Sequence, residues 1–184
     1  MNMSTRITRI TRITAAAATG LVAALALTGV SAATASAAPA KAAKTVTCTP
    51  ANTKISVSTV SRPINHLLIK ATNKGKTPCY SYGAPLIGFD HPQSTVWTLD
   101  ESRPQAVVTL KPGQSAYASV LTSGGDGAGS GGHLSKEMSL NFEGRAMAGS
   151  VGPTAFPKVP AKTWVDDSAA VSYWQSTAAD ALIW

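Results

Sequence analysis

The sequence predicts an all-β protein, an Ig-like antiparallel β-sandwich that is preceded by a signal peptide and a flexible linker. Two observations carry this prediction: short apolar runs are cut by Gly, Pro, Asn and Asp, and no segment has a convincing amphipathic helical pattern. Several runs alternate apolar and polar residues, which is typical of half-buried strands. The 184 residues suit one domain, so we assign residues 48–174 to the sandwich and 175–184 to a C-terminal tail.

The first 37 residues are predicted to be a secretory signal peptide. Arg6, Arg9 and Arg12 form a positive start, residues 13–30 are apolar and uncharged, and Ala35-Ser36-Ala37 is a small-x-small cleavage site. The alternative is a transmembrane anchor, which the interrupting Thr and Gly residues disfavour. We therefore expect Sec-type export, cleavage after Ala37 and a secreted product with no transmembrane anchor after processing. Residues 38–47 are rich in Ala, Lys and Thr and are expected to be a flexible linker.

The strands of the sandwich follow from the same apolar runs. We expect them over residues 54–60, 66–72, 79–82, 86–90, 96–99, 106–110, 115–121, 138–143, 162–165 and 169–174. The run 66–72 is apolar on both faces, which places it at the centre of a sheet. The turn sequence Lys111-Pro112-Gly113-Gln114 predicts that the strands on either side of it form a hairpin. Gly and Pro make 149–160 irregular, and 176–184 has the pattern of a short capped helix.

The two cysteines, Cys48 and Cys79, are predicted to form an intramolecular disulfide. An even number of cysteines in an exported protein favours a bridge. One strand out and one strand back separate the two positions, and this path brings them close together. Two inert buried thiols and an intermolecular bridge are the alternatives.

The charge of the chain indicates a solvated surface. The formal net charge is +7, and removing residues 1–37 takes away three Arg, so 13 Lys and Arg face nine acids and the mature chain carries +4. The lysines are scattered and are not interleaved with aromatic residues as in a nucleic-acid platform. We expect no nucleic-acid binding and a monomer, with loose contact to anionic cell-wall polymers as the alternative.

No catalytic or metal-binding constellation stands out, and no cofactor is predicted. The histidines His66, His91 and His133 lack metal-site spacing, although Asp90-His91 is a possible acid–base fragment. A Ser–His–Asp triad is always possible on a β fold because its geometry is non-local, but no Gly-x-Ser-x-Gly elbow singles out a nucleophile.

Two further motifs have a structural interpretation and a functional one. The pairs Asp100-Glu101 and Asp166-Asp167 converge on one site only if they lie in loops, because strand neighbours point to opposite faces. Gly75-Lys76-Thr77 looks like the tail of a phosphate-binding loop, but Pro78 forbids the helix that such a loop needs, so we predict a turn.

The aromatic residues fill the core or line a binding face for carbohydrate or peptide. Strand positions favour the core. The residues concerned are Tyr80, Tyr82, Trp97, Trp164, Tyr173 and Trp174. Trp184 at the end of the sequence either docks onto the sandwich or stays exposed.

The order of motifs resembles the exported actinobacterial family called domain of unknown function 4232. The resemblance rests on the first Cys, the Leu-x-Ile-x-Ala-Thr-Asn-x-Gly-x-x-Pro-Cys segment at 67–79, the Tyr-Gly-x-Pro segment at 82–85, and the segment at 110–116. It implies a secreted or membrane-tethered Ig-like β-sandwich with no assigned activity and no catalytic residues to transfer. Many members have a second cysteine pair late in the domain, and this chain has no cysteine after Cys79.

The sequence therefore predicts a secreted, non-catalytic β-sandwich domain that serves as a binding or structural module. Its unknown partner would lie at the cell envelope or outside the cell. A secreted hydrolase with an unrecognised Ser/His/Asp site is one alternative. An extracellular protease inhibitor that uses the Gly-rich loop at 123–132 is another, and it requires that loop to be rigid.

Overall fold

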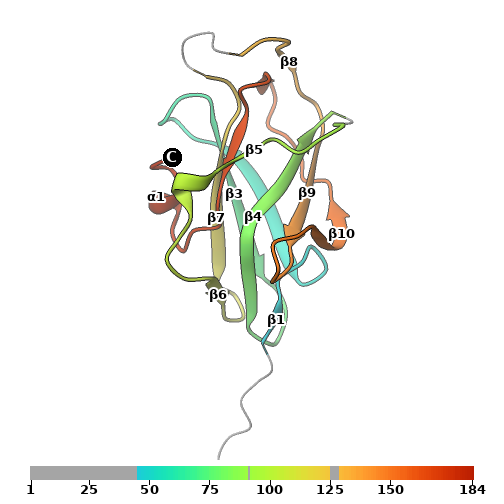
Figure 1. Ribbon diagram of the computed structural model, residues 1–184, viewed down its shortest axis with the longest axis vertical. Coiled ribbons are helices and arrows are strands. Elements are labelled where there is room, and N and C mark those ends of the chain that lie inside the picture. The colour runs from blue at the N-terminus through green and yellow to red at the C-terminus, as the bar shows by residue number, and fades with distance from the viewer. Residues whose placement is uncertain (1–44, 91, 125–128) are drawn as a thin grey trace, which may run out of the picture. The chain divides into compact units, whose positions relative to one another are not determined.

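The computed structural model describes residues 45–90, 92–124 and 129–184. The predicted signal peptide, the linker up to residue 44, His91 and the centre of the Gly-rich loop lie outside the described residues. The described part is an all-β, sandwich-like fold with one short α-helix, which confirms the predicted class (Figure 1).

The first sheet is built around β4 (Cys79–Phe89). Its order is β1 (Val46–Thr47), β4, β9 (Met138–Glu143) and β10 (Ser150–Ala155), and β6 (Val108–Leu110) also pairs with β4. The second sheet has the order β2 (Thr53–Thr59), β3 (His66–Asn73), β7 (Ser115–Leu121), β12 (Ala170–Ser172) and β5 (Trp97–Leu99). The prediction that 66–72 is a central strand is confirmed, because β3 lies between β2 and β7.

A small ribbon and two short helices complete the described fold. The strands β8 (His133–Leu134) and β11 (Trp164–Val165) pair with each other. A 3-10 turn, η1 (Asp100–Ser102), follows β5. The helix α1 (Ala178–Ala181) begins at the expected cap, where the Thr177 hydroxyl accepts a hydrogen bond from the Asp180 N–H at 3.0 Å.

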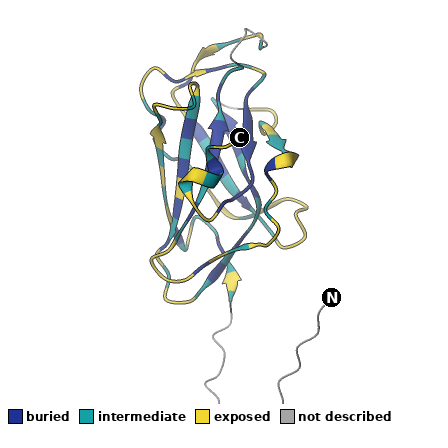
Figure 2. Ribbon diagram, turned by 90° about the vertical axis from the view of Figure 1, so that its left-hand side faces the viewer, coloured by how far each residue is buried: buried dark blue, intermediate teal, exposed yellow. Residues whose placement is uncertain are grey.

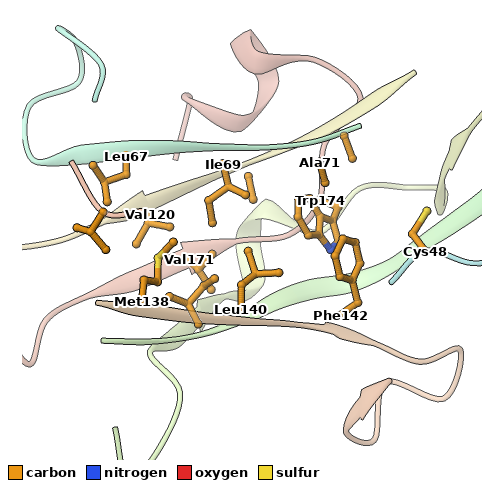
Figure 3. Close-up of a cluster of buried hydrophobic side chains, with 14 of the residues drawn as sticks. Cys48, Leu67, Ile69, Ala71, Val120, Met138, Leu140, Phe142, Val171 and Trp174 are labelled. Carbon is orange, nitrogen blue, oxygen red and sulfur yellow. The ribbon is translucent and has the colours of Figure 1, made fainter. Parts of the chain in front are cut away.

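The core lies between the two sheets, and the period-two alternation of the strands builds it. Every second residue of β3, β7 and β9 is buried: Leu67, Ile69, Ala71, Ala116, Ala118, Val120, Met138, Leu140 and Phe142. Trp174 follows β12 and is fully buried, with its ring stacked on Phe142 at 5.0 Å between centroids (Figure 3). Figure 2 shows the buried residues on the inner strands and the exposed ones in the connecting loops.

Two predicted features of strand pairing are wrong. Pairing is not antiparallel throughout, because β1 runs parallel to β4 and β12 runs parallel to β5. The predicted strands 79–82 and 86–90 form the single strand β4. Its register shifts between Tyr82 and Leu86, and Gly83 has a φ of +58°. A β-bulge tolerates such a Gly and the missing N–H of Pro85, so the chain continues through residues that normally end a strand.

The predicted hairpin around residues 111–114 is also wrong. The turn exists, with the Gln114 N–H bonded to the Lys111 carbonyl at 2.9 Å, but β6 pairs with β4 and β7 pairs with β3. The chain therefore crosses between sheets at this turn. Buried Asn73 holds the crossing: its main chain bonds Gly113 and Gln114, and its amide N–H groups donate to the carbonyls of Thr77 and Leu110.

Two further corrections concern segments expected to lack structure. The predicted linker 38–47 ends earlier than expected, because Val46–Thr47 form β1 beside β4. The segment 149–160 contains the strand β10. This strand lies at the edge of its sheet, has a register shift after Val151, and tolerates Gly152 and Pro153 for that reason.

Candidate binding cleft

The predicted disulfide between Cys48 and Cys79 is confirmed. Both residues are fully buried, their sulfur atoms are bonded and their Cα atoms are 5.0 Å apart. The bridge lies beside the β1–β4 pairing, where the Cys48 N–H donates to the Tyr80 carbonyl at 2.8 Å. The two cysteines are 31 positions apart in the sequence, and the loop that the bridge closes contains β2 and β3.

A cleft of about 430 Å³ lies where β4 ends and β5 begins. Three parts of the chain line it: Phe89 with residues 92–97, the end of the Gly-rich loop with His133, and the connection between β11 and β12. A volume of this size is within the range of about 300–1,000 Å³ for small-molecule sites. In Figure 1, β8 marks this end of the sandwich.

Asp166 and Asp167 lie in the loop between β11 and β12, and both line the cleft. The Asp166 carboxylate accepts hydrogen bonds from the Ser123 hydroxyl at 2.6 Å and from the N–H and hydroxyl of Ser168. The Asp167 carboxylate accepts the N–H and the hydroxyl of Ser130, each at 2.6 Å. The two acids thus hold the two described ends of the Gly-rich loop, and they converge because they lie in a loop.

These contacts keep both carboxylates ionised. Hydrogen bonds from the hydroxyls of Ser123 and Ser168 lower the pKa of Asp166 below its ordinary value. The hydroxyl and then the N–H of Ser130 lower the pKa of Asp167. All of these donors are neutral, so they orient the carboxylates without cancelling their charge.

The ring of His133 is bonded to Asp90, with 3.0 Å between Nε2 and Oδ2. The other oxygen of Asp90 accepts the N–H groups of Lys136 and Glu137, each at 3.0 Å. Burial raises the pKa of Asp90, but the hydrogen bonds of Lys136, Ser135, Glu137 and His133 outweigh it and lower the pKa to about 2. None of the described serines is hydrogen-bonded to His133, so this pair is not extended to a triad within the described part.

The other predicted acid–base residues lie away from this cleft. The ring of His66 contacts main-chain oxygens of Ile64 and Trp184, at 2.6 and 3.1 Å. Asp100 and Glu101 lie in η1, where Asp100 pairs with Arg103 at 3.7 Å. Gly75 lies in a turn closed by the Asn73 side chain, as predicted.

The expectation that the tryptophans fill the core is correct for Trp174 and wrong for Trp97 and Trp164. Trp97 begins β5, a three-residue edge strand, and is 76% exposed on the wall of the cleft. Trp164 is 50% exposed, and its ring packs over Gly132, where an added Cβ would lie 2.4 Å from Cζ2. The main-chain oxygen of Trp184 accepts a hydrogen bond from the Ser119 hydroxyl at 3.2 Å, so the chain end docks on β7.

Two kinds of feature are absent from the described residues. They contain no group of three or more His, Cys, Asp or Glu side chains arranged to hold a metal ion. No helix among them is long and apolar enough to cross a membrane. The protease-inhibitor hypothesis stays a prediction, because residues 125–128 of its loop lie outside the described part.

The described features define a class of protein, an all-β sandwich domain with one buried disulfide and an open cleft at one end. A comparison with known protein families matches residues 48–175 to the family described as Domain of unknown function (DUF4232). The match covers more than half of the chain, and the chain belongs to this family. No curated protein and no solved structure matches the chain.

Proposed function

We propose that this protein is an exported, non-catalytic binding module that acts at the cell envelope or outside the cell. Its cleft takes a ligand that presents a cationic ammonium or guanidinium group. The observation that carries this proposal is the 76% exposed indole of Trp97 on the same cleft as Asp166 and Asp167.

Charge favours a cationic ligand over a neutral or anionic one. The described lining contains two ionised aspartates and no lysine or arginine, although the whole chain is basic. The hydrogen bonds to these aspartates come from neutral groups, so the negative charge remains available to a ligand. An indole adds cation–π attraction, worth about 0.5–1 kcal/mol at exposed sites and more when the cation is desolvated.

Export is supported by the three-part pattern of residues 1–37 and by the buried disulfide. N-terminal sequencing of secreted material tests it, and we expect the mature chain to begin at Ala38. Material that still begins at Met1 would contradict it. The mature chain is further proposed to be a monomer without nucleic-acid affinity, so any retention on DNA should disappear at moderate salt.

The cleft is tested by calorimetry with the mature protein and a pentalysine peptide. The matched probe is the same peptide with every Nε acetylated, which keeps the length and removes the charge. We expect only the charged peptide to bind, and we expect binding to weaken as salt rises. Equal binding of both peptides, or none by the charged one, would refute the proposal.

Variants then locate the binding site. Trp97→Ala and Asp167→Asn should each weaken pentalysine binding by about fivefold or more, because each removes one contact worth roughly 1 kcal/mol. Two controls lie outside the cleft: Phe156→Ala removes another exposed aromatic ring, and Glu101→Gln removes another exposed carboxylate. Equal losses in the controls would show non-specific attraction.

A hydrolase is a second candidate, because His133, which lines the cleft, is bonded to Asp90 with 3.0 Å between Nε2 and Oδ2. This activity requires a nucleophile or an activated water on the other ring nitrogen of His133. The test is turnover of a panel of chromogenic esters and glycosides by the mature protein. Turnover that His133→Gln abolishes would support the hydrolase and would displace the binding-module proposal.

A further inference from the structure

A second pocket, of about 140 Å³, lies apart from the cleft and shares no lining residue with it. It is bounded by the middle of β4, the connection between η1 and β6, and the residue that follows β12. Its lining includes Ser81, Gly83, Arg103, Val107, Met147 and Tyr173.

A buried hydroxyl lies in the lining of this pocket. Ser81 points inward from β4 and is only 2% exposed, yet its Oγ has no hydrogen-bond partner among the described residues. Leaving a buried hydroxyl unpaired is unfavourable, and most buried polar side chains in proteins do have a partner. In this conformation the Oγ is closed off from solvent, so a molecule bound in the pocket supplies that partner when the Ser81 side chain rotates towards it.

The mouth of the pocket is apolar. Val107 and Met147 are both about half-exposed there, and Met147 is held in place by a turn in which its N–H donates to the Gly144 carbonyl at 2.9 Å. Apolar side chains of this size favour an apolar ligand, because binding removes their surface from water.

The one charged side chain in the described lining, Arg103, already has partners. Its guanidinium lies 4.9 Å from the centre of the Tyr173 ring, donates to the Tyr173 hydroxyl, and lies 3.7 Å from the Asp100 carboxylate. Since Asp100 balances this charge, the pocket does not require an anionic ligand. The guanidinium instead forms a flat, polarisable wall.

We propose that this pocket binds a small, neutral, ring-sized molecule that carries one hydroxyl or carbonyl group, a phenol-like ligand. Its polar atom pairs with the Ser81 hydroxyl, and its ring lies between Val107, Met147 and the Arg103–Tyr173 pair. The size fits this class, since an apolar cavity of about 150 Å³ engineered in another protein holds benzene. This ligand is neutral and the site is separate, so the inference does not depend on the cation-binding cleft.

The test compares phenol with toluene, which matches phenol in size and lacks the hydroxyl. Both are titrated into the oxidised mature protein and followed by NMR shifts of the amides of Ser81, Gly83 and Val107. We expect saturable shifts at these amides, with phenol binding more tightly than toluene. Equal affinities, or shifts spread over the whole surface, would overturn the proposal.

Ser81→Ala is the decisive variant. It should weaken phenol binding about fivefold, as expected for one hydrogen bond, and leave toluene binding unchanged. Ser94→Ala in the cleft is the matched control and should alter neither. If phenol binds Ser81→Ala as tightly as it binds the unaltered protein, the proposal is wrong. The Ser81 hydroxyl then has a hydrogen-bond partner other than the ligand, for example a bound water. A thermal melt of Ser81→Ala confirms that the variant folds.

Discussion

Removing the Cys48–Cys79 bridge should lower the free energy of unfolding by about 3.7 kcal/mol in the chain-entropy account, for a loop separation of 31 residues. That is a large share of the roughly 5–15 kcal/mol that stabilises a typical domain. The perturbation is the double variant Cys48→Ala/Cys79→Ala, and the assay is urea unfolding followed by tryptophan fluorescence. The midpoint should fall well below that of the oxidised protein.

Reduced, otherwise unaltered protein is the control. It loses the covalent link but keeps both buried sulfur atoms, so it separates loop entropy from the cavity that alanine leaves. We expect the reduced protein to account for most of the loss. If the free energies of unfolding of the reduced and oxidised proteins differ by less than about 1 kcal/mol, the entropic account of this bridge is refuted.

Hydrogen exchange adds a local readout for the same perturbation. The N–H groups of Val46 and Cys48 donate to the carbonyls of Pro78 and Tyr80, which ties β1 to β4. Without the bridge, β1 is a two-residue edge strand, so these two amides should exchange faster than those of β3. Unchanged protection of Val46 would show that β1 is held independently of the disulfide.

Three more predictions concern single residues. Because the pKa of Asp90 is lowered from 3.8 to about 2, its ionised form contributes stability above pH 4 that is lost as the pH falls toward 2. The loss is at most about 2 kcal/mol, and Asp90→Asn should flatten this part of the stability–pH curve. Trp174→Ala should cost about 3–5 kcal/mol in urea unfolding, because the ring is fully buried on Phe142, and a loss below 1 kcal/mol would contradict its place in the core. Gly83→Ala should destabilise by about 1–3 kcal/mol, since Gly83 has a φ of +58° and an added Cβ would lie 1.8 Å from Glu143 Oε2; an unchanged melting temperature would refute this.

Local periodicity was sufficient where strands are regular. The strands β2, β3, β7 and β9 begin and end within one residue of the expected ranges, because alternating side chains report directly on which face is buried. Periodicity failed at β4, since a bulge at Gly83 and Pro85 looks the same in sequence as the end of a strand. A Gly or a Pro can end a strand, or it can bend a strand that then continues. In β4 the strand continues because β9 pairs with it on both sides of the bulge.

The crossing at residues 111–114 shows a second limit. A Pro-Gly turn between two apolar runs is the same locally whether the runs pair with each other or enter different sheets. Here the deciding contacts come from Asn73, whose side chain reaches Leu110 over a separation of 37 residues. The sequence does show Asn73, a polar residue at the end of a buried strand. It does not show that Asn73 binds Leu110, because that residue lies far away in the chain.

The candidate cleft was recognised only in parts. The sequence singles out the cleft residues His133, Trp97 and the Asp166-Asp167 pair, and it singles out Asp90 as well. Nothing local indicates that His133 meets Asp90 across 43 residues. The sequence favours the core over a binding face for Trp97, because aromatic residues at strand positions are usually buried. Its exposure follows from its place on β5, a short edge strand whose pairing with β12 is parallel and therefore has no hairpin signature.

The two acids of the cleft have two physical roles, and these roles can be separated. Their hydrogen bonds hold the described ends of the Gly-rich loop, and their charge gives the cleft its sign. Asparagine at position 167 retains one oxygen acceptor for the Ser130 N–H but carries no charge. If Asp167→Asn keeps the amide shifts of Ser130 and loses affinity for pentalysine, charge governs the ligand and hydrogen bonding governs the loop. If both change together, the loop itself forms the binding surface, and the charge acts only by holding it in place.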